Sequence, residues 1–160
     1  MRQGGGKAKG SAWERAVAKD LSQWYYGDPN YLIRSQSSGA MATVRGNGLI
    51  PGGDIFQIKI GVKEFPFSVE CKALKEFLID DILFKREKTI SYKAWLQCIG
   101  DAEKTKKIPM LIGKGNRRDA YIICPVGLKD IWFPNLLTCS NDEVIIAVYK
   151  NFLLAKPMGE

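Results

Sequence analysis

The chain has 160 residues, of which 46% are hydrophobic, 26% charged and 11% aromatic, a composition typical of one globular domain. No apolar run approaches the ~20 residues that span a bilayer, and no apolar segment follows the charged N-terminus, so we expect neither a membrane protein nor a secretory signal. Lysine and arginine number 24 against 17 acidic residues, and this net charge of +7 favours a polyanionic partner such as nucleic acid.

The N-terminal region predicts a tail followed by a helix. Residues 1–10 are rich in glycine and lysine and are typical of a flexible basic arm, which leaves residues 11–160 for a single folded domain. Ser11 and Glu14 have the spacing of a capping box, and the apolar residues that follow have helical spacing. We therefore expect a helix from Ser11 to the turn at Gly27.

The next segments predict a short strand, a long loop and a hairpin. Residues 31–34 favour a strand, and the irregular loop over 35–53 has a length typical of functional segments. Residues 54–60 and 65–72 both alternate between apolar and polar side chains, as half-buried strands do. The turn over 61–63 can join them as an antiparallel hairpin.

The second half of the chain supplies one clear helix and further strands. Ser91 is the expected N-cap of a helix whose apolar face extends to Ala102. Strands are predicted over 108–112, 120–124 and 144–149. Strands mixed with two clear helices predict an α/β domain in which helices flank a central mixed β-sheet.

The absence of histidine narrows the available chemistry. It excludes histidine general bases, Ser–His and Cys–His nucleophile pairs, and zinc sites with a histidine ligand. Acid–base chemistry must then come from carboxylates, lysines or a metal-bound water. The four cysteines lack CxxC spacing and have apolar neighbours, so we expect buried thiols in a reducing cytoplasm rather than a disulfide or metal framework.

The expected hairpin gathers charged side chains. A turn centred on Val62 would place Asp54 opposite Glu70 with Cβ atoms ~5 Å apart, and Lys72 would project from the same face. Two carboxylates this close repel unless a cation or a proton lies between them. Oxygen ligands without imidazole favour Mg²⁺, with Mn²⁺ as a substitute. The alternative is a solvated polar face that carries an incidental ion pair.

Asp54 with Glu70-Cys71-Lys72 resembles the D…(D/E)xK signature of the PD-(D/E)xK nuclease superfamily. Within it, the chain most resembles the archaeal-type Holliday junction resolvases and their phage relatives. The resemblance implies a restriction-endonuclease-like fold and a divalent metal held by Asp54, Glu70 and the main-chain carbonyl of Cys71. It also implies catalytic roles for Asp54, Glu70 and Lys72.

Two further segments carry this resemblance. Residues 10–15 (GSAWER) resemble the basic-Gly-x-x-x-Glu-Arg segment of these resolvases, which implies that Glu14 is a third catalytic, metal-binding carboxylate. The alternative is that Glu14 only caps the helix. Residues 34–39 (RSQSSG) resemble an Arg…Ser-Gly loop, which implies a DNA contact by Arg34 and a catalytic role for Ser38.

Two other positions relate to the same superfamily. Gln97 falls where many members have a glutamine beside the active site. A proline usually stands directly before the aspartate, but here Gly52 and Gly53 intervene between Pro51 and Asp54. This departure puts the local turn in question but leaves the carboxylate in place.

Cationic residues in the arm and loops are candidates for phosphate contacts, because such segments can follow a nucleic-acid backbone. They are Arg2, Lys7, Lys9, Arg15, Arg34, Arg45, Arg117 and Arg118. One site per chain and two symmetric cuts per junction favour a C2 homodimer. The apolar segments at 131–133 and 152–154 could belong to that interface or to the core.

These features predict a Mg²⁺-dependent, structure-selective endonuclease that resolves four-way (Holliday) junctions in branched double-stranded DNA by paired symmetric cuts. Such an enzyme would serve DNA recombination or repair in the cytoplasm of a prokaryotic or phage-infected host cell. Two alternatives remain open: a restriction-type, repair or single-strand nuclease on the same fold, and a non-catalytic DNA-binding module.

Overall fold

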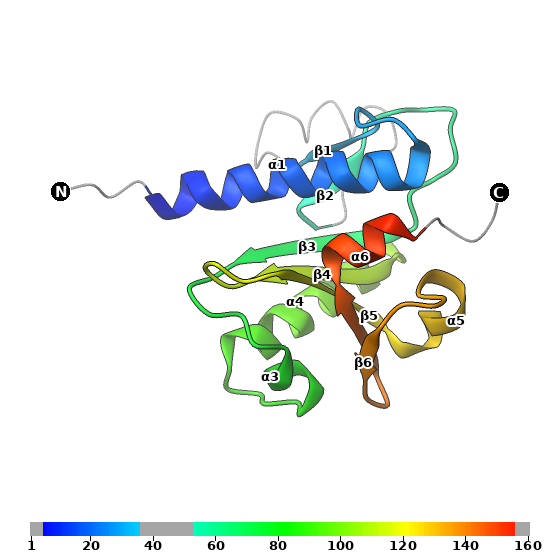
Figure 1. Cartoon of the computed structure of the whole chain (residues 1–160). Coiled ribbons are helices and arrows are strands. Elements are labelled where there is room, and N and C mark those ends of the chain that lie inside the picture. The colour runs from blue at the N-terminus through cyan, green and yellow to red at the C-terminus, as the bar shows by residue number, and fades with distance from the viewer. Residues whose placement is uncertain (1–4, 36–52, 156–160) are drawn as a thin grey trace.

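A five-stranded mixed β-sheet lies at the centre of the structure (Figure 1). The computed structural model describes residues 5–35 and 53–155. In spatial order the strands are β3 (Phe67–Ala73), β4 (Ile108–Lys114), β5 (Ala120–Pro125), β7 (Val144–Val148) and β6 (Thr138–Ser140). β3 and β4 are parallel, and the other neighbouring strands are antiparallel. The predicted strands over 108–112, 120–124 and 144–149 are confirmed, whereas the sequence analysis missed β6.

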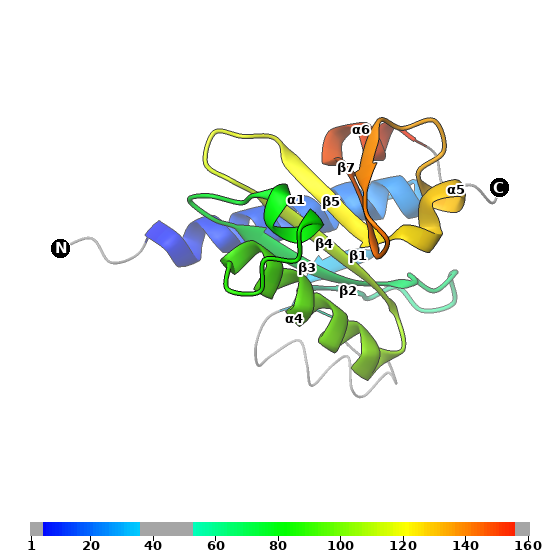
Figure 2. The same cartoon turned by 90° about the horizontal axis from the view of Figure 1, so that it is seen from below.

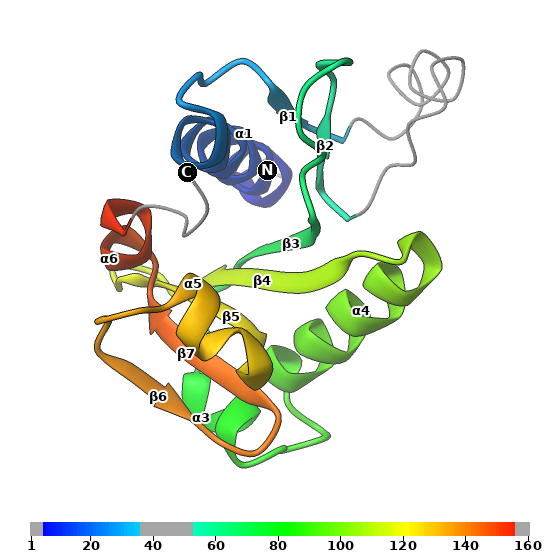
Figure 3. The ribbon, with the colours of Figure 1, turned by 90° about the vertical axis from the view of Figure 1, so that its right-hand side faces the viewer.

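Helices cover both faces of this sheet, as the end-on view in Figure 3 shows. The helices on one face are α1 (Gly5–Tyr26) and α6 (Tyr149–Leu154), and those on the other are α3 (Ile79–Leu83) and α4 (Ile90–Thr105). Figure 2 shows α4 beneath β3 and β4. Each face has its own apolar core. The predicted α/β architecture, a mixed sheet flanked by helices, is confirmed.

Alternation along β3 decides which side chains meet which layer. Val69 and Cys71 belong to the core under α1, whereas Glu70 and Lys72 face α4, where their polar atoms reach Gln97. Because successive side chains of a strand point to opposite faces, this division follows from the sequence once β3 is placed. Glu70 is thereby a charged side chain with only 4% of its surface exposed.

The predicted hairpin between residues 54–60 and 65–72 is wrong. β2 (Ile55–Gln57) pairs antiparallel with β1 (Leu32–Arg34), and β3 takes β4 as its parallel neighbour. In place of a hairpin ladder, an isolated parallel bridge joins Gly53 to Val69 of β3. Asp54 therefore does not lie opposite Glu70 in an antiparallel ladder.

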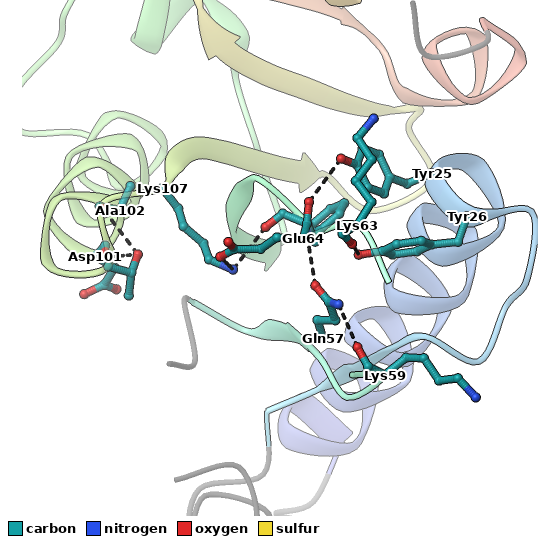
Figure 4. A network of polar contacts seen from close by, with 11 residues as sticks. Tyr25, Tyr26, Gln57, Lys59, Lys63, Glu64, Asp101, Ala102 and Lys107 are labelled. Carbon is teal, nitrogen blue, oxygen red and sulfur yellow. Dashed lines mark hydrogen bonds and ion pairs between the residues drawn. The ribbon is translucent and has the colours of Figure 1, made fainter. Parts of the chain in front are cut away.

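Side chains form hydrogen bonds with main-chain groups of the segment that connects β2 to β3 (Figure 4). The Tyr25 hydroxyl donates a hydrogen bond to the Glu64 carbonyl (3.1 Å), and the buried Gln57 side chain accepts the Phe65 N–H (2.9 Å). Main-chain groups that a hairpin ladder would pair are thus already bonded to side chains. The alternation of apolar and polar residues does not reveal these hydrogen bonds.

The two long helices begin elsewhere than predicted. α1 begins at Gly5, so Ser11 lies inside it and residues 5–10 of the expected arm are helical. α4 is capped by Thr89, whose side chain accepts the N–H of Tyr92. Ser91 is buried and accepts the Leu78 N–H (3.1 Å), which ties α4 to the segment before α3. The Ser91 hydroxyl thus serves a contact 13 residues away, while Thr89 caps α4.

The C-terminal third divides its apolar residues between core and surface. A 3₁₀ turn, η1 (Val126–Leu128), and α5 (Lys129–Trp132) connect β5 to β6. Phe133 and Phe152 are buried, whereas 49% of Ile131 and 84% of Leu154 are exposed. All four cysteines are free thiols; Cys71, Cys98 and Cys124 are buried as predicted, whereas Cys139 is only partly buried. Over the described ranges, no helix is both long and apolar enough to span a bilayer.

Candidate active site

Asp54 is docked on the free edge of β3. Its N–H donates to the Val69 carbonyl (2.7 Å), and its Oδ2 accepts the Cys71 N–H (2.8 Å). The Asp54 carbonyl in turn accepts the N–H of Ser35 at the end of β1 (2.6 Å). β3 is the outermost strand of its sheet, so these main-chain groups are available to Asp54. The strand edge itself fixes the first carboxylate of the site.

Gly53 explains the departure from the usual Pro-Asp pair. Its φ is +70°, and a Cβ at this position would overlap the Val69 carbonyl. Proline is confined to φ near −65° and could not adopt this conformation. Glycine at position 53 therefore lets the backbone lie against β3 and deliver Asp54 to its edge.

Glu70, Lys72 and Gln97 form a closed polar triangle between β3 and α4. Lys72 Nζ lies 2.5 Å from Glu70 Oε1, and Gln97 Nε2 donates to the same oxygen (3.1 Å). Lys72 Nζ also donates to Gln97 Oε1 (3.3 Å). Each member thus has two partners, and the glutamine that the resemblance singles out is brought to the predicted residues.

The electrostatics of these groups indicate a place for a cation. Burial raises the pKa of Asp54, and the negative charge of Glu14 adds to this. Burial and the neighbouring Asp54 raise the pKa of Glu70. Burial lowers the pKa of Lys72, but its bond to Glu70 and the negative charges of Glu70 and Asp54 together outweigh this effect and leave the pKa raised, so Lys72 is an ammonium rather than a neutral base.

The donor atoms present fit a hard divalent cation. No hydrogen bond among the described residues uses Asp54 Oδ1 or Glu70 Oε2. The N–H and carbonyl of one strand residue lie on the same edge, so the Cys71 carbonyl shares the edge where its N–H meets Asp54. These oxygen donors, without histidine or an ionised thiol, suit Mg²⁺ or Mn²⁺ rather than zinc.

Glu14, the predicted third carboxylate, is paired with Arg34. Arg34 Nε lies 2.9 Å from Glu14 Oε2, and their side chains are 24% and 21% exposed. Arg34 is paired in register with Ile55, the residue after Asp54, so the pair lies beside Asp54. Across the part of the chain that the structure describes, no three His, Cys, Asp or Glu side chains are grouped to hold a metal. Glu14 is thus near the site but is held by an arginine.

A basic hollow lies where β3 ends, close to Lys72. It is lined by Lys9, Ala73, Leu74, Lys114, Gly115, Asn116, Arg117 and Arg118. In Figure 1 this is the region where the start of α1 approaches the β4–β5 turn. Lys9 Nζ donates to Asn116 Oδ1 (2.5 Å), and Lys114 Nζ lies over the Trp13 ring, 4.0 Å from its centroid. These two contacts join α1 to the end of β4 and the turn that follows it. We call this surface the basic hollow.

The remaining predicted residues are distributed as follows. Arg15 is exposed on α1, and only the backbone of Lys7 is described. Arg2, Ser38 and Arg45 lie outside the described residues.

Sequence reasoning missed two residues of the basic hollow, Lys114 and Asn116. They belong to the same basic turn as Arg117 and Arg118, so the run itself was the available signal.

An acidic residue and a lysine two positions apart on a strand, with an aspartate at its edge, define the class of PD-(D/E)xK nucleases. Residues 5–151 match the family described as "Phage putative PDDEXK endonuclease", and the chain belongs to this family. It is an endonuclease of the PD-(D/E)xK superfamily, and its fold is the restriction-endonuclease-like fold that the sequence predicts.

One solved structure with a similar chain is Archaeoglobus fulgidus Hjc, described as a Holliday junction resolvase from an archaeal hyperthermophile. The two chains are 15% identical, with 94% of this chain and 92% of that chain covered and a TM-score of 0.38. No curated protein matches.

Proposed function

We propose that the protein is a Mg²⁺-dependent endonuclease that resolves four-way DNA junctions. The observation that carries the metal-dependent cut is the docking of Asp54 beside Glu70 and Lys72 at the free edge of β3. Membership of a phage endonuclease family supports DNA cleavage. The choice of a branched substrate is supported by the resemblance of residues 10–15 and 34–39 to segments of junction resolvases.

Each residue of the site has a role in this proposal. Asp54, Glu70 and the Cys71 carbonyl would hold the divalent cation, which when bound supplies an activated water and stabilises negative charge on the scissile phosphate. Lys72, kept protonated by Glu70, stabilises charge on the phosphate oxygens. Gln97 bonds to both Glu70 and Lys72 and so holds their side-chain ends in fixed positions relative to each other. The resemblance adds a catalytic role for Ser38.

DNA contacts are proposed to extend from the site into the basic hollow. Ala73 and Leu74 of the hollow directly follow Lys72, so the hollow lies at the end of the strand that carries the site. Contacts to phosphates position a duplex without reading its sequence, as a structure-selective enzyme requires. Further phosphate contacts are proposed for Arg2, Lys7, Lys9, Arg15, Arg34, Arg45, Arg117 and Arg118.

A homodimer completes the proposal. Each chain has one such site, whereas resolving a junction requires cuts on two strands. A two-fold dimer presents two sites to a two-fold substrate, so the second cut becomes effectively intramolecular. The exposed Ile131 and Leu154 are candidate interface residues, whereas Phe133 and Phe152 belong to the core.

A cleavage panel tests the substrate. A four-way junction, a flap, a linear duplex and a single strand of shared sequence are incubated with the full chain, with Mg²⁺ or with EDTA. We expect Mg²⁺-dependent cleavage of the junction in preference to the other three. Preference for the flap, duplex or single strand would show a repair or restriction-type nuclease instead. Binding without cleavage in Mg²⁺ would show a non-catalytic DNA-binding module.

Light scattering and a cruciform plasmid test the assembly. A mass twice that of the 17.9 kDa chain, with mostly linear plasmid product, supports paired cuts by a dimer. A monomer mass with only nicked product would overturn the dimer.

A further inference from the structure

The Glu14–Arg34 ion pair joins two residues to which the resemblance to junction resolvases gives separate tasks. That resemblance implies that Glu14 is a further metal-binding carboxylate and that Arg34 contacts DNA. In the structure they bind each other, with Arg34 Nε 2.9 Å from Glu14 Oε2. A carboxylate oxygen engaged in this bond is hindered from binding a cation, and the arginine is hindered from binding a phosphate.

The net charge of the site changes when a divalent cation binds and again when DNA binds. Glu14, Asp54 and Glu70 supply three negative charges when ionised, against two positive charges from Arg34 and Lys72, which leaves a net charge of −1. A divalent cation changes this to +1, and one phosphodiester returns it to zero. The site is therefore balanced only when cation and DNA are both bound.

The fold allows Arg34 to change partner without a movement of the backbone. The next residue, Ser35, is hydrogen-bonded to the Asp54 carbonyl, which fixes the end of β1 beside the site. The Arg34 side chain has several rotatable bonds and remains about a quarter exposed. A guanidinium does not lose its proton, so an Arg34 released from Glu14 needs another anion.

We propose that the Glu14–Arg34 pair couples divalent-cation binding to DNA binding. Arg34 competes with the cation for Glu14, and once displaced it binds a backbone phosphate of the DNA at the site. Because such coupling is reciprocal, DNA that engages Arg34 frees Glu14 and raises the affinity for the cation. This inference rests on the proposed function, since it takes the cation and the phosphate from it.

Metal binding in the absence of DNA gives the first test. Isothermal titration calorimetry with Mn²⁺ compares the full-length wild type with Arg34→Gln and with Lys19→Gln, which removes one exposed cation from α1. Arg34→Gln is expected to bind Mn²⁺ about two- to fivefold more tightly than Lys19→Gln, the range of a partly exposed ion pair. Arg34→Lys keeps the charge and should lie near the wild type.

DNA binding in EDTA gives the second test, because no metal is present and no cleavage can occur. A fluorescent junction is titrated with the wild type, Glu14→Gln, Arg34→Gln and the double variant. Glu14→Gln frees Arg34 and should tighten binding by about two- to fivefold. When Arg34 is already replaced by glutamine, adding Glu14→Gln should tighten DNA binding much less. The double-mutant cycle therefore distinguishes the effect of a released Arg34 from the effect of removing a negative charge.

The outcomes distinguish the coupling from the proposed function. Equal Mn²⁺ affinities for Arg34→Gln and Lys19→Gln, or additive effects in the DNA cycle, would overturn the coupling even if the wild type cuts junctions. A coupled cycle in a protein that cuts linear duplex instead would leave the coupling standing and overturn the junction assignment. Thermal unfolding of each variant confirms that a folded protein is compared.

Discussion

Gln97 on α4 donates a hydrogen bond from Nε2 to Oε1 of Glu70 on β3, at 3.1 Å and across 27 residues of sequence. The buried Glu70 thereby has a neutral partner as well as Lys72. The bond fixes the orientation of a carboxylate that would otherwise be restrained on one side by a flexible lysine. α4 thus contributes directly to the geometry of the site.

Replacing Gln97 should impair the cut and spare the fold. Gln97→Ala removes bonds to two charged groups, so we expect the cleavage rate at saturating DNA to fall about tenfold or more. DNA affinity in EDTA and the thermal unfolding midpoint should stay unchanged, because Gln97 is an exposed residue outside the apolar cores. Lys93→Ala on the same helix is the matched control. A cleavage rate within twofold of the wild type would show that Gln97 does not orient Glu70.

Removing one charge at Glu70 should separate cutting from binding. Glu70→Gln keeps the shape of the side chain but removes a carboxylate proposed to hold the metal, so cleavage should be abolished. Junction affinity in EDTA should change little, because phosphate contacts elsewhere dominate binding. Single-turnover cleavage and fluorescence titration measure the two effects. Glu103→Gln, exposed on α4, should cut as the wild type does, and wild-type cleavage by Glu70→Gln would disprove the site.

The basic hollow should appear in the salt dependence of DNA binding. Arg117→Ala combined with Arg118→Ala removes two proposed phosphate contacts, so the slope of log affinity against log salt should become shallower by about 1.8, from ~0.9 per contact on duplex DNA. Titrations at several salt concentrations in EDTA measure this slope. Lys129→Ala controls for net charge, because Lys129 belongs to α5, which Figure 1 draws on the opposite side of the molecule from the β4–β5 turn. An unchanged slope in the double variant would exclude the hollow from the DNA interface.

Asp20 on α1 should give the fold a measurable pH dependence. Burial raises the pKa of its carboxyl above the ordinary value, so the folded state binds a proton more readily than the unfolded state. Stability therefore falls as pH rises from about 4, the unfolded pKa, through the raised pKa, and is level above it. Asp20→Asn lacks this fall, so its stability relative to the wild type should increase over the same window.

Urea unfolding in EDTA between pH 3 and pH 7 checks this dependence. Asp130→Asn, an exposed substitution of the same kind on α5, serves as the control. A stability difference between Asp20→Asn and the wild type that stays constant with pH would contradict the expectation.

The sequence by itself determined the chemistry and most local elements. The absence of histidine and the alternation around Glu70 and Lys72 limited the site to carboxylates and an ammonium on one strand face. Helical spacing located α4, and the apolar runs located β4, β5 and β7. These inferences succeed because periodicity and side-chain chemistry are local properties, which residues close together in the chain express without reference to distant partners.

Only the tertiary structure decided which elements meet. It replaced the expected hairpin by the docking of Asp54 on the edge of β3, where Gly53 permits the close approach. It also brought Gln97 to Glu70 and Glu14 to Arg34. Such contacts join residues 17 to 27 positions apart, and they depend on which strands pair and which helix covers each face. The energy of packing the whole sheet sets that pairing, and no local pattern encodes it.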